Sequence, residues 1–346
     1  GMKVIHIPDT IEINDDIRGL TSVVCHSLSD VPNIIDTWNE GKVVDTEGYY
    51  ENAKINRVYV DRVHVKKAFA EYTAAYNADD SKIKLKIDHT YRVAALCERI
   101  AKAAGMCAYD VELAWLSGML HDVGRFEQIK RYNTFSDADS VDHARFGADL
   151  LFKDGLISTF LKGMVKCTGY KPGALEDRYG SDGVFLYNKL NKSDMEMLEL
   201  AIRCHNMYRI PQGLNRREQA FCNVLRDADK VDIFKVNIDT PLEEIYNTTT
   251  EELMKSDITD EVLEAFGEEH CILKAIRRTP ADTVIGHVSL AYELVYDESV
   301  RITVEQGYLG KLMHFHSDNE ETNRKMAMVR EKMDSHVKKR IGKKDA

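Results

Sequence analysis

Residues Ser117–Gln128 read SGMLHDVGRFEQ and place a histidine and an aspartate side by side directly after an apolar run. The preceding YDVELAWLSGML has the spacing of a buried helix, so His121 and Asp122 fall in the last turn of that helix. A buried imidazole and a buried carboxylate are costly unless they are paired or coordinate a metal ion. The rest of the sequence must therefore supply their partner.

The overall charge argues against one class of partner. The chain has 346 residues, with 47 Lys and Arg against 57 Asp and Glu, which gives a net charge of −10. A nucleic-acid partner is not expected, because it requires clustered Lys and Arg. A small anionic substrate remains compatible with this balance, since a local pocket can be basic on an acidic protein.

The cysteines and the apolar segments bear on the compartment. The 7 cysteines include no C-x-x-C pair and fall largely within apolar patterns, which favours free thiols and a cytoplasmic location. The start of the sequence lacks a basic stretch followed by a long apolar one, so we expect no signal peptide. No apolar run is long enough for a membrane span, so we expect no membrane partner. The sequence does not define an oligomeric state, and a homo-oligomer stays open.

Helical periodicity dominates the chain and predicts an all-α fold. Only the opening MKVIHI is expected to form a short strand. The predicted helices cover residues 59–78, 87–105, 109–124, 140–155, 193–210 and 217–236.

Capping residues suggest where some of these helices begin and end. Gly105 is expected to end one helix, and Asp110 to cap the next, which would then stop at Gly124. Asp139 or Ser140 is expected to open the helix that follows.

The sequence divides into three predicted regions. Residues 1–80 form a mixed or helical N-terminal extension, residues 81–240 form the core, and residues 241–346 form a C-terminal helical subdomain. Within the core, residues 169–194 are rich in Gly, Pro, Asp and Asn and are predicted to be a long loop.

Four further residues with metal-binding side chains lie on apolar helix faces. His89, His143, His205 and Asp229 each have apolar residues three, four or seven positions away, so each is expected to point into the core. One such residue alone is more often a hydrogen-bonded core residue than a ligand. Five helices that each direct a metal-binding side chain into the core predict a metal site. Asp232 could hydrogen-bond to one of these ligands and orient it. His and Asp ligands favour Fe, Mn, Ni, Co or Zn over Mg.

The order of these residues resembles the HD-domain metal-dependent phosphohydrolases. Their pattern of a helix His, an adjacent His-Asp and a distant Asp appears here in KIDHTYRV, GMLHDVGR and RDADKVDIF, and the resemblance covers residues 83–236. It implies an HD-domain helical bundle, a divalent metal ion held by four residues, and attack of a metal-bound water on a phosphate ester. Those four residues are His89, His121, Asp122 and Asp229.

A second metal ion is also implied by the resemblance. In HD-GYP members two more histidines hold it, and their positions match His143 in DHARFGADLL and His205 in IRCHNMYRI, with Asp122 as the bridge between both ions. The GYP signature itself is missing, since NMYRIPQG follows His205, and this puts cyclic dinucleotide hydrolysis in doubt. We therefore expect one or two divalent ions, drawn from Mn, Fe, Ni, Co, Zn and Mg.

Basic residues near these motifs are candidates for phosphate contacts. Arg125 occupies the slot where other HD members carry Lys, and Lys230 follows Asp229 as in nucleotide-cleaving relatives. With Asp122, these two are the expected catalytic residues. The expected substrate-binding residues are Lys86, Arg92, Arg125, Arg209 and Lys230. The polar segment 132–143 is expected to form a loop over the site, with its Asp residues supporting the ligands.

Three functions are compatible with this ligand set. The leading hypothesis is hydrolysis of a small phosphomonoester or phosphodiester, nucleotide-derived, by a metal-activated water. A diiron oxygenase of the HD fold would use the same ligands. A non-catalytic sensor or ligand-binding protein is the third reading, although degenerate members usually lose the His-Asp pair, which is intact here.

Overall fold

The computed structural model describes residues 5–6, 23–24, 35, 59–77, 79–161, 165–166, 192–246 and 248–342. These residues form an all-α fold, as predicted, with two minimal strand pairs. β1 (Ile5–His6) pairs in parallel with β2 (Val23–Val24), and β3 (Tyr59–Val60) pairs antiparallel with β4 (Val165–Lys166). Residues 169–191 of the predicted loop and most of the predicted extension 1–80 lie outside the described residues, whereas residues 192–194 of that loop belong to a helix.

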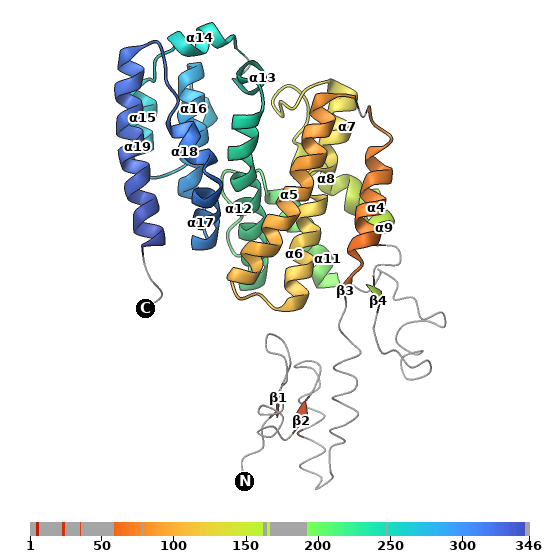
Figure 1. Ribbon diagram of the computed structural model, residues 1–346. Helices are drawn as coiled ribbons and strands as arrows, with labels where there is room; N and C mark the ends of the chain where they lie inside the picture. The colour runs from red at the N-terminus through yellow and green to blue at the C-terminus, as the bar shows by residue number, and fades with distance from the viewer. Residues whose placement is uncertain are drawn as a thin grey trace, which may run out of the picture.

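The helices of the first half surround the predicted site. They are α4 (Arg62–Thr73), α5 (Ser81–Ala103), α6 (Ala108–Leu120), α7 (Val123–Tyr132), α8 (His143–Ala148), the π-helical turn η2 (Asp149–Lys153), α9 (Ile157–Leu161), α11 (Lys192–Cys204) and α12 (Arg216–Asp239). Figure 1 shows α12 standing between this group and the C-terminal helices.

The C-terminal helices are mostly shorter. They are α13 (Leu242–Tyr246), α14 (Thr250–Lys255), α15 (Asp260–Gly267), η4 (Lys274–Ile276), α16 (Pro280–Val288), η5 (Ser289–Glu293), α17 (Asp297–Gln306), α18 (Tyr308–Met313) and the long α19 (Glu320–Ile341). Of these, α17, α18 and η5 pack against α12.

Two predicted helix ends near the His-Asp pair were wrong. The N-cap of α6 is Cys107, not Asp110, which lies in the first turn of the helix. The helix ends at Leu120 rather than at Gly124, and α7 begins at Val123, so Gly124 lies inside a helix that the sequence did not predict. The chain thus turns sharply at the His-Asp pair instead of running on past it.

Three other predicted ends can be compared directly. Asp142 caps α8 through the N–H groups of Ala144 and Arg145, so the prediction of Asp139 or Ser140 was wrong. The helix α11 ends at Cys204, six residues before the predicted limit at residue 210. Gly105 is confirmed as the residue after the end of α5, where its φ of +71° suits glycine.

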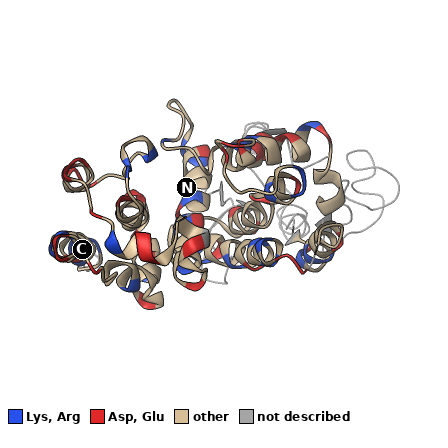
Figure 2. Ribbon diagram, turned by 90° about the horizontal axis from the view of Figure 1, so that it is seen from above, with Lys and Arg blue, Asp and Glu red and all other residues tan. Residues whose placement is uncertain are grey.

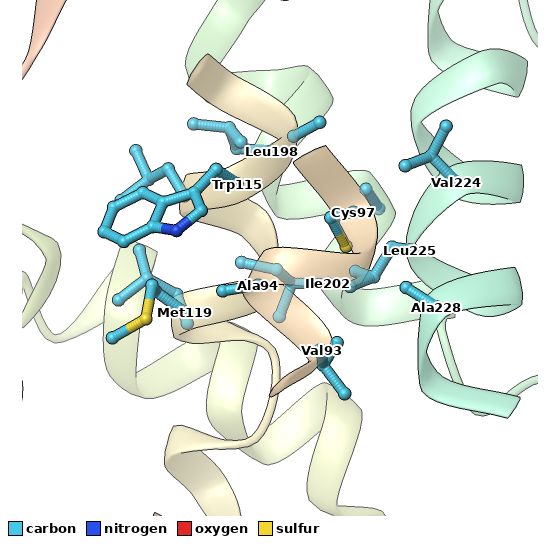
Figure 3. Close-up of a cluster of buried hydrophobic side chains, with 14 of the residues drawn as sticks. Val93, Ala94, Cys97, Trp115, Met119, Leu198, Ile202, Val224, Leu225 and Ala228 are labelled. Atoms are coloured by element: carbon cyan, nitrogen blue, oxygen red, sulfur yellow. The ribbon is translucent and has the colours of Figure 1, made fainter. Parts of the chain in front are cut away.

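Side chains of four helices pack together in one part of the main core. Figure 3 shows buried side chains of α5, α6, α11 and α12 packed together, with Trp115 and Met119 of α6 on one side and Val224, Leu225 and Ala228 of α12 on the other. Burying each large aliphatic or aromatic side chain contributes roughly 1.5–3 kcal/mol. A second core forms where Phe234 of α12 meets α15, α16, α18 and α19. Because α12 contributes to both cores, it joins the two groups of helices.

The helices α5 and α6 approach to backbone contact. A Cβ atom added at Gly118 would lie 2.6 Å from the Cα of Ala94, a distance that real side chains do not reach. Glycine at this position therefore allows α5 and α6 to pack closely, three residues before His121. The same contact brings the imidazoles of His89 and His121 together.

In the view of Figure 2, Lys and Arg are interspersed with Asp and Glu along the described helices.

Within the described residues, no helix combines the length and the apolar character needed to cross a bilayer.

Candidate metal centre

The structure brings all six predicted ligands to one buried place. They come from the middle of α5, the junction of α6 and α7, the start of α8, the end of α11 and the middle of α12. The exposed fraction is 4% or less for each of the four histidines and 2% for Asp122. The six residues are His89, His121, Asp122, His143, His205 and Asp229.

Each imidazole turns the same nitrogen toward the centre. The Nδ1 atoms of His121 and His205 lie 2.8 and 2.7 Å from the carbonyl oxygens of Gly118 and Ile202, and a carbonyl can only accept. Both Nδ1 atoms therefore carry the hydrogen, and the neutral rings present a lone pair at Nε2. Outward hydrogen bonds of this kind are what orient a metal-binding histidine.

The inward nitrogens lie close to one another. The Nε2 atoms of His89 and His121 are 3.3 Å apart, and those of His143 and His205 are 3.0 Å apart. Two lone pairs at these distances repel unless a proton or a metal ion lies between them. The arrangement is therefore two pairs of imidazoles, each requiring a cation.

Asp122 lies between the two pairs. Its Oδ2 is 3.6 Å from the Nε2 of His89 and 3.5 Å from that of His121, and its Oδ1 is 3.5 Å from the Nε2 of His143 and 3.8 Å from that of His205. Asp122 is also the N-cap residue of α7 but makes no side-chain capping bond, so its carboxylate is free for the centre. One oxygen thus faces each pair, as expected of a bridging carboxylate.

Two features show that the residues fit a bound cation. The Oδ1 of Asp122 is buried without a hydrogen-bond partner, although a buried carboxylate oxygen normally has one. Asp229 completes the other side, with its Oδ1 3.1 Å from the Nε2 of His89 and 3.9 Å from that of His121. His89, His121 and Asp229 form one group of mutually close ligand atoms, and His121, Asp122 and His205 form another.

The electrostatics keep most of these groups ready to bind a cation. Burial lowers the pKa of His143 and of His205 to about 4, helped by Arg125 near the first and His121 near the second. Burial also lowers the pKa of His121. At neutral pH these three imidazoles are therefore neutral, which is the state that coordinates a metal.

The carboxylates and His89 behave differently. Burial acts to raise the pKa of Asp122, but Lys86, His121 and His143 together hold it well below its usual range. Burial and Lys86 act to lower the pKa of His89, but its contacts with Asp229 and Asp232 raise it. A proton on His89 thus occupies the place where a cation would neutralise the two carboxylates.

Partners behind the ligands fix their orientation. The Oδ2 of Asp232 lies 2.6 Å from the Nδ1 of His89, which confirms the supporting contact expected from the sequence. Both oxygens of Asp232 also accept hydrogen bonds from Arg92, at 2.6 and 2.9 Å. The guanidinium of Arg92 is therefore held beside Asp232, on the side of His89 that faces away from the centre. The predicted contact of Arg92 with the substrate stays a prediction.

The polar segment expected to cover the site also supports it. The Oδ2 of Asp137 lies 2.7 Å from the Nδ1 of His143, and its Oδ1 accepts from Arg125 at 2.8 Å and from Gln128 at 3.0 Å. The side-chain amide of Gln128, fully buried, also donates to the hydroxyl of Ser140. The sequence reasoning missed Gln128, because it lies on the separate helix α7, after the turn at His121, where the periodicity of the preceding helix gives no information.

The predicted basic residues lie at different places around the centre. The ammonium of Lys86 is 2.7 Å from the Oδ2 of Asp122, and the Nε of Arg125 is 3.8 Å from its Oδ1. Lys230, next to the ligand Asp229, is half-buried. Arg209 is exposed and lies over the ring of Tyr208, at 5.7 Å from the ring centroid.

A comparison with protein-family models matches this chain to the HD domain over residues 87–341. A match to the HD domain describes this class of metal-binding fold, which is a bundle of helices around paired histidines and a shared aspartate. The chain belongs to the HD-domain family. HD domains bind divalent metal ions and are commonly metal-dependent phosphohydrolases. No curated protein and no solved structure matches the chain.

Proposed function

We propose that this protein is a metal-dependent phosphohydrolase that cleaves a small phosphomonoester or phosphodiester, nucleotide-derived, in the cytoplasm. The observation that supports this most is the convergence of four inward Nε2 atoms on the two oxygens of one buried carboxylate. That donor set fits two divalent ions of the Mn, Fe, Ni, Co or Zn type.

The six ligand residues would hold the two ions in two groups. His89, His121 and Asp229 would hold one ion, His143 and His205 the other, and Asp122 both. A bound divalent ion supplies an activated water near neutral pH and polarises a phosphoryl oxygen. Because the ligands are almost fully buried, they exclude bulk water from the reacting group.

Positive charge at the edge of the centre would orient the substrate. The ammonium of Lys86 reaches Asp122, and Lys230 lies beside Asp229 with no ion-pair partner among the described residues. In this proposal both would face the oxygens of a phosphate bound at the centre. The Nη1 of Arg125 donates to the carbonyl oxygen of Phe135 and to Asp137. Its other nitrogens would be left to approach the same phosphate.

The proposal is tested by metal content and turnover together. The protein would be stripped with a chelator, reloaded with each candidate ion, and assayed on bis-p-nitrophenyl phosphate and a nucleotide panel. We expect turnover only with metal, and its loss in Asp122→Asn. Asp154→Asn changes an exposed carboxylate outside the centre and serves as the matched control.

Two other outcomes would favour the alternative functions. Oxygen consumption with a mixed-valence iron signal would identify an oxygenase. Metal binding without turnover on any phosphorylated compound, with nucleotide binding that survives loss of the ligands, would identify a sensor.

A further inference from the structure

Two cations on α12 stand next to the centre without a counter-ion. Arg226 lies one helical turn before the ligand Asp229, and Lys230 lies one turn after Arg226. Among the described residues, neither forms an ion pair. Like charges at this spacing repel, and a buried charge without a partner is costly, so the fold keeps them at a cost in stability.

Arg226 is the more unusual of the two because it is almost fully buried, at 8% exposed. A guanidinium offers five N–H donors, yet the only bond it makes within the described part of the chain runs from Nη2 to the carbonyl oxygen of Tyr208, at 3.1 Å. Its Nε is buried and has no hydrogen-bond partner. The fork of donors that suits a phosphate or carboxylate is therefore largely unused.

The acidic groups around this pair are already engaged. Asp227, on the same helix, accepts bonds from the N–H groups of Val295 and Tyr296. Asp229 faces His89 in the metal centre. Glu293, the remaining nearby carboxylate, accepts from the N–H of Cys271 at 3.3 Å, and it does not pair with Lys230.

The position of Arg226 relates it to both halves of the centre. It precedes the ligand Asp229 by three residues, and it is bonded to Tyr208, which follows the ligand His205 by three residues. A group that reached Arg226 would therefore lie beside the centre, about one helical turn from it, and not within it.

We infer that Arg226 and Lys230 form a second oxyanion subsite, so that the substrate carries another phosphate or a carboxylate besides the phosphate that is cleaved. This inference rests on the proposed function for the identity of the cleaved group, and it narrows the substrate class to compounds with two anionic groups. Lys230, which follows the ligand Asp229 directly, would contact both anionic groups.

Binding of three matched phosphonates tests the subsite without turnover, because their P–C bonds are not hydrolysed. Propylphosphonate carries one anionic group, 3-phosphonopropionate adds a carboxylate, and propane-1,3-diyl bisphosphonate adds a second phosphonate. Their dissociation constants would be measured by calorimetry on the manganese-loaded full chain. We expect at least one doubly anionic probe to bind about tenfold more tightly than propylphosphonate, and the tighter of the two identifies the second group.

Substitutions assign that preference to the subsite. In Arg226→Gln and in Lys230→Gln we expect the ratio of dissociation constants to fall toward one, and in Arg226→Lys to fall only in part. Arg216→Gln removes an exposed cation from the same helix and should keep the full preference. Circular dichroism and bound manganese would be measured for each variant to show that it is folded.

The inference is overturned if the folded wild type shows no preference for a doubly anionic probe, or if folded Arg226→Gln and Lys230→Gln both keep it. Its failure can be told apart from failure of the proposed function. Turnover on simple phosphate esters without the binding preference would leave the function standing. The preference without turnover on any ester would leave the subsite standing.

Discussion

At the scale of single residues, the two oxygens of Asp122 decide how many ions the centre holds. Its Oδ2 faces His89 and His121, and its Oδ1 faces His143 and His205. Removing the carboxylate takes a ligand from both groups, whereas removing one imidazole takes a ligand from one group only. The ion count should therefore separate these substitutions.

We predict that the wild type binds two ions per chain, that His143→Ala keeps one, and that Asp122→Ala keeps less than one. The remaining ion in His143→Ala would be held by His89, His121 and Asp229. Elemental analysis after gel filtration gives the counts. Equal losses in the two variants would show that the two groups do not bind ions separately.

Residues that hydrogen-bond to the ligands allow a prediction about metal affinity. Asp137 accepts from the Nδ1 of His143 at 2.7 Å, and losing such a partner typically weakens metal affinity by about 10–100-fold. Asp137→Ala should therefore weaken one ion by that factor and leave the ion at His89 bound. Asp139→Ala, on the same loop but exposed, is the control. Competition with a chromogenic chelator measures both affinities, and an equal effect of the two substitutions would exclude this role for Asp137.

At the scale of helices, glycine contacts fix where the ligands meet. A Cβ atom at Gly124 would lie 2.5 Å from the carbonyl oxygen of His143 and 2.7 Å from the backbone nitrogen of Gly147. The start of α7 is thus in backbone contact with α8, whose first residue is the ligand His143. The glycine that was predicted to stop a helix instead permits this approach.

Gly124→Ala should therefore separate α7 from α8, lower the melting temperature and release the ion held by His143. The methyl group cannot be accommodated without moving backbone, and such overpacking costs about 1–3 kcal/mol or more. Gly310→Ala, on α18 with nothing within 4 Å of an added Cβ, should be neutral or slightly stabilising. Thermal unfolding and metal content measure both, and a Gly124→Ala protein that keeps both ions and its melting temperature would contradict the packing argument.

The same example shows which parts of the structure the sequence could predict. Apolar periodicity placed His89, His143, His205 and Asp229 inward, because the faces of long helices repeat over several turns. The turn at His121 was not predictable in this way, because α7 starts two residues after His121 without a break in polarity. Its N-cap residue, Asp122, makes no side-chain capping bond, so no capping signal marks the start of α7.

At the scale of the whole molecule, α12 connects the metal centre to the C-terminal helices. The same helix carries Asp229 into the centre and Phe234 into the second core. The family match runs through both, over residues 87–341. The C-terminal helices should therefore affect the stability of the centre even where they hold none of its ligands.

Acid should weaken the C-terminal core through His287 on α16, whose ring lies 5.6 Å from that of Tyr246. Burial lowers the pKa of His287 to about 3, with help from Arg277 and Lys274, against an ordinary value of 6.5. Between these values the unfolded chain binds a proton that the folded chain does not. The stability contributed at His287 is therefore complete above about pH 6.5 and is lost progressively as the pH falls toward 3.

His287→Gln should accordingly lose less melting temperature than the wild type between pH 7.5 and pH 5. The control is His316→Gln, at an exposed position, which should follow the wild type. Calorimetric scans at the two pH values give the comparison. Parallel losses in all three proteins would show that His287 titrates normally in the folded state.

The final prediction concerns whether the first group of helices is stable alone. Asp227 of α12 is fully buried, and its carboxylate accepts from the N–H of Val295 at 3.0 Å, the N–H of Tyr296 at 2.9 Å and the hydroxyl of Ser299 at 2.7 Å. A chain that ends at Thr240 loses all three donors and exposes the apolar side of α12. Each large apolar side chain that loses its burial costs roughly 1.5–3 kcal/mol, so a few of them remove a large part of the roughly 5–15 kcal/mol that stabilises a typical domain.

We therefore expect the chain ending at Thr240 to show no cooperative thermal transition and to retain no metal after gel filtration. The full-length Asp227→Asn protein keeps the C-terminal helices but places an amide N–H₂ against backbone donors, so it should unfold cooperatively at a lower temperature. A shortened chain that unfolds cooperatively and binds two ions would instead show that residues 1–240 fold without the C-terminal helices. In that case the hydrogen bonds that Asp227 accepts would position the C-terminal helices without being needed to form the metal centre.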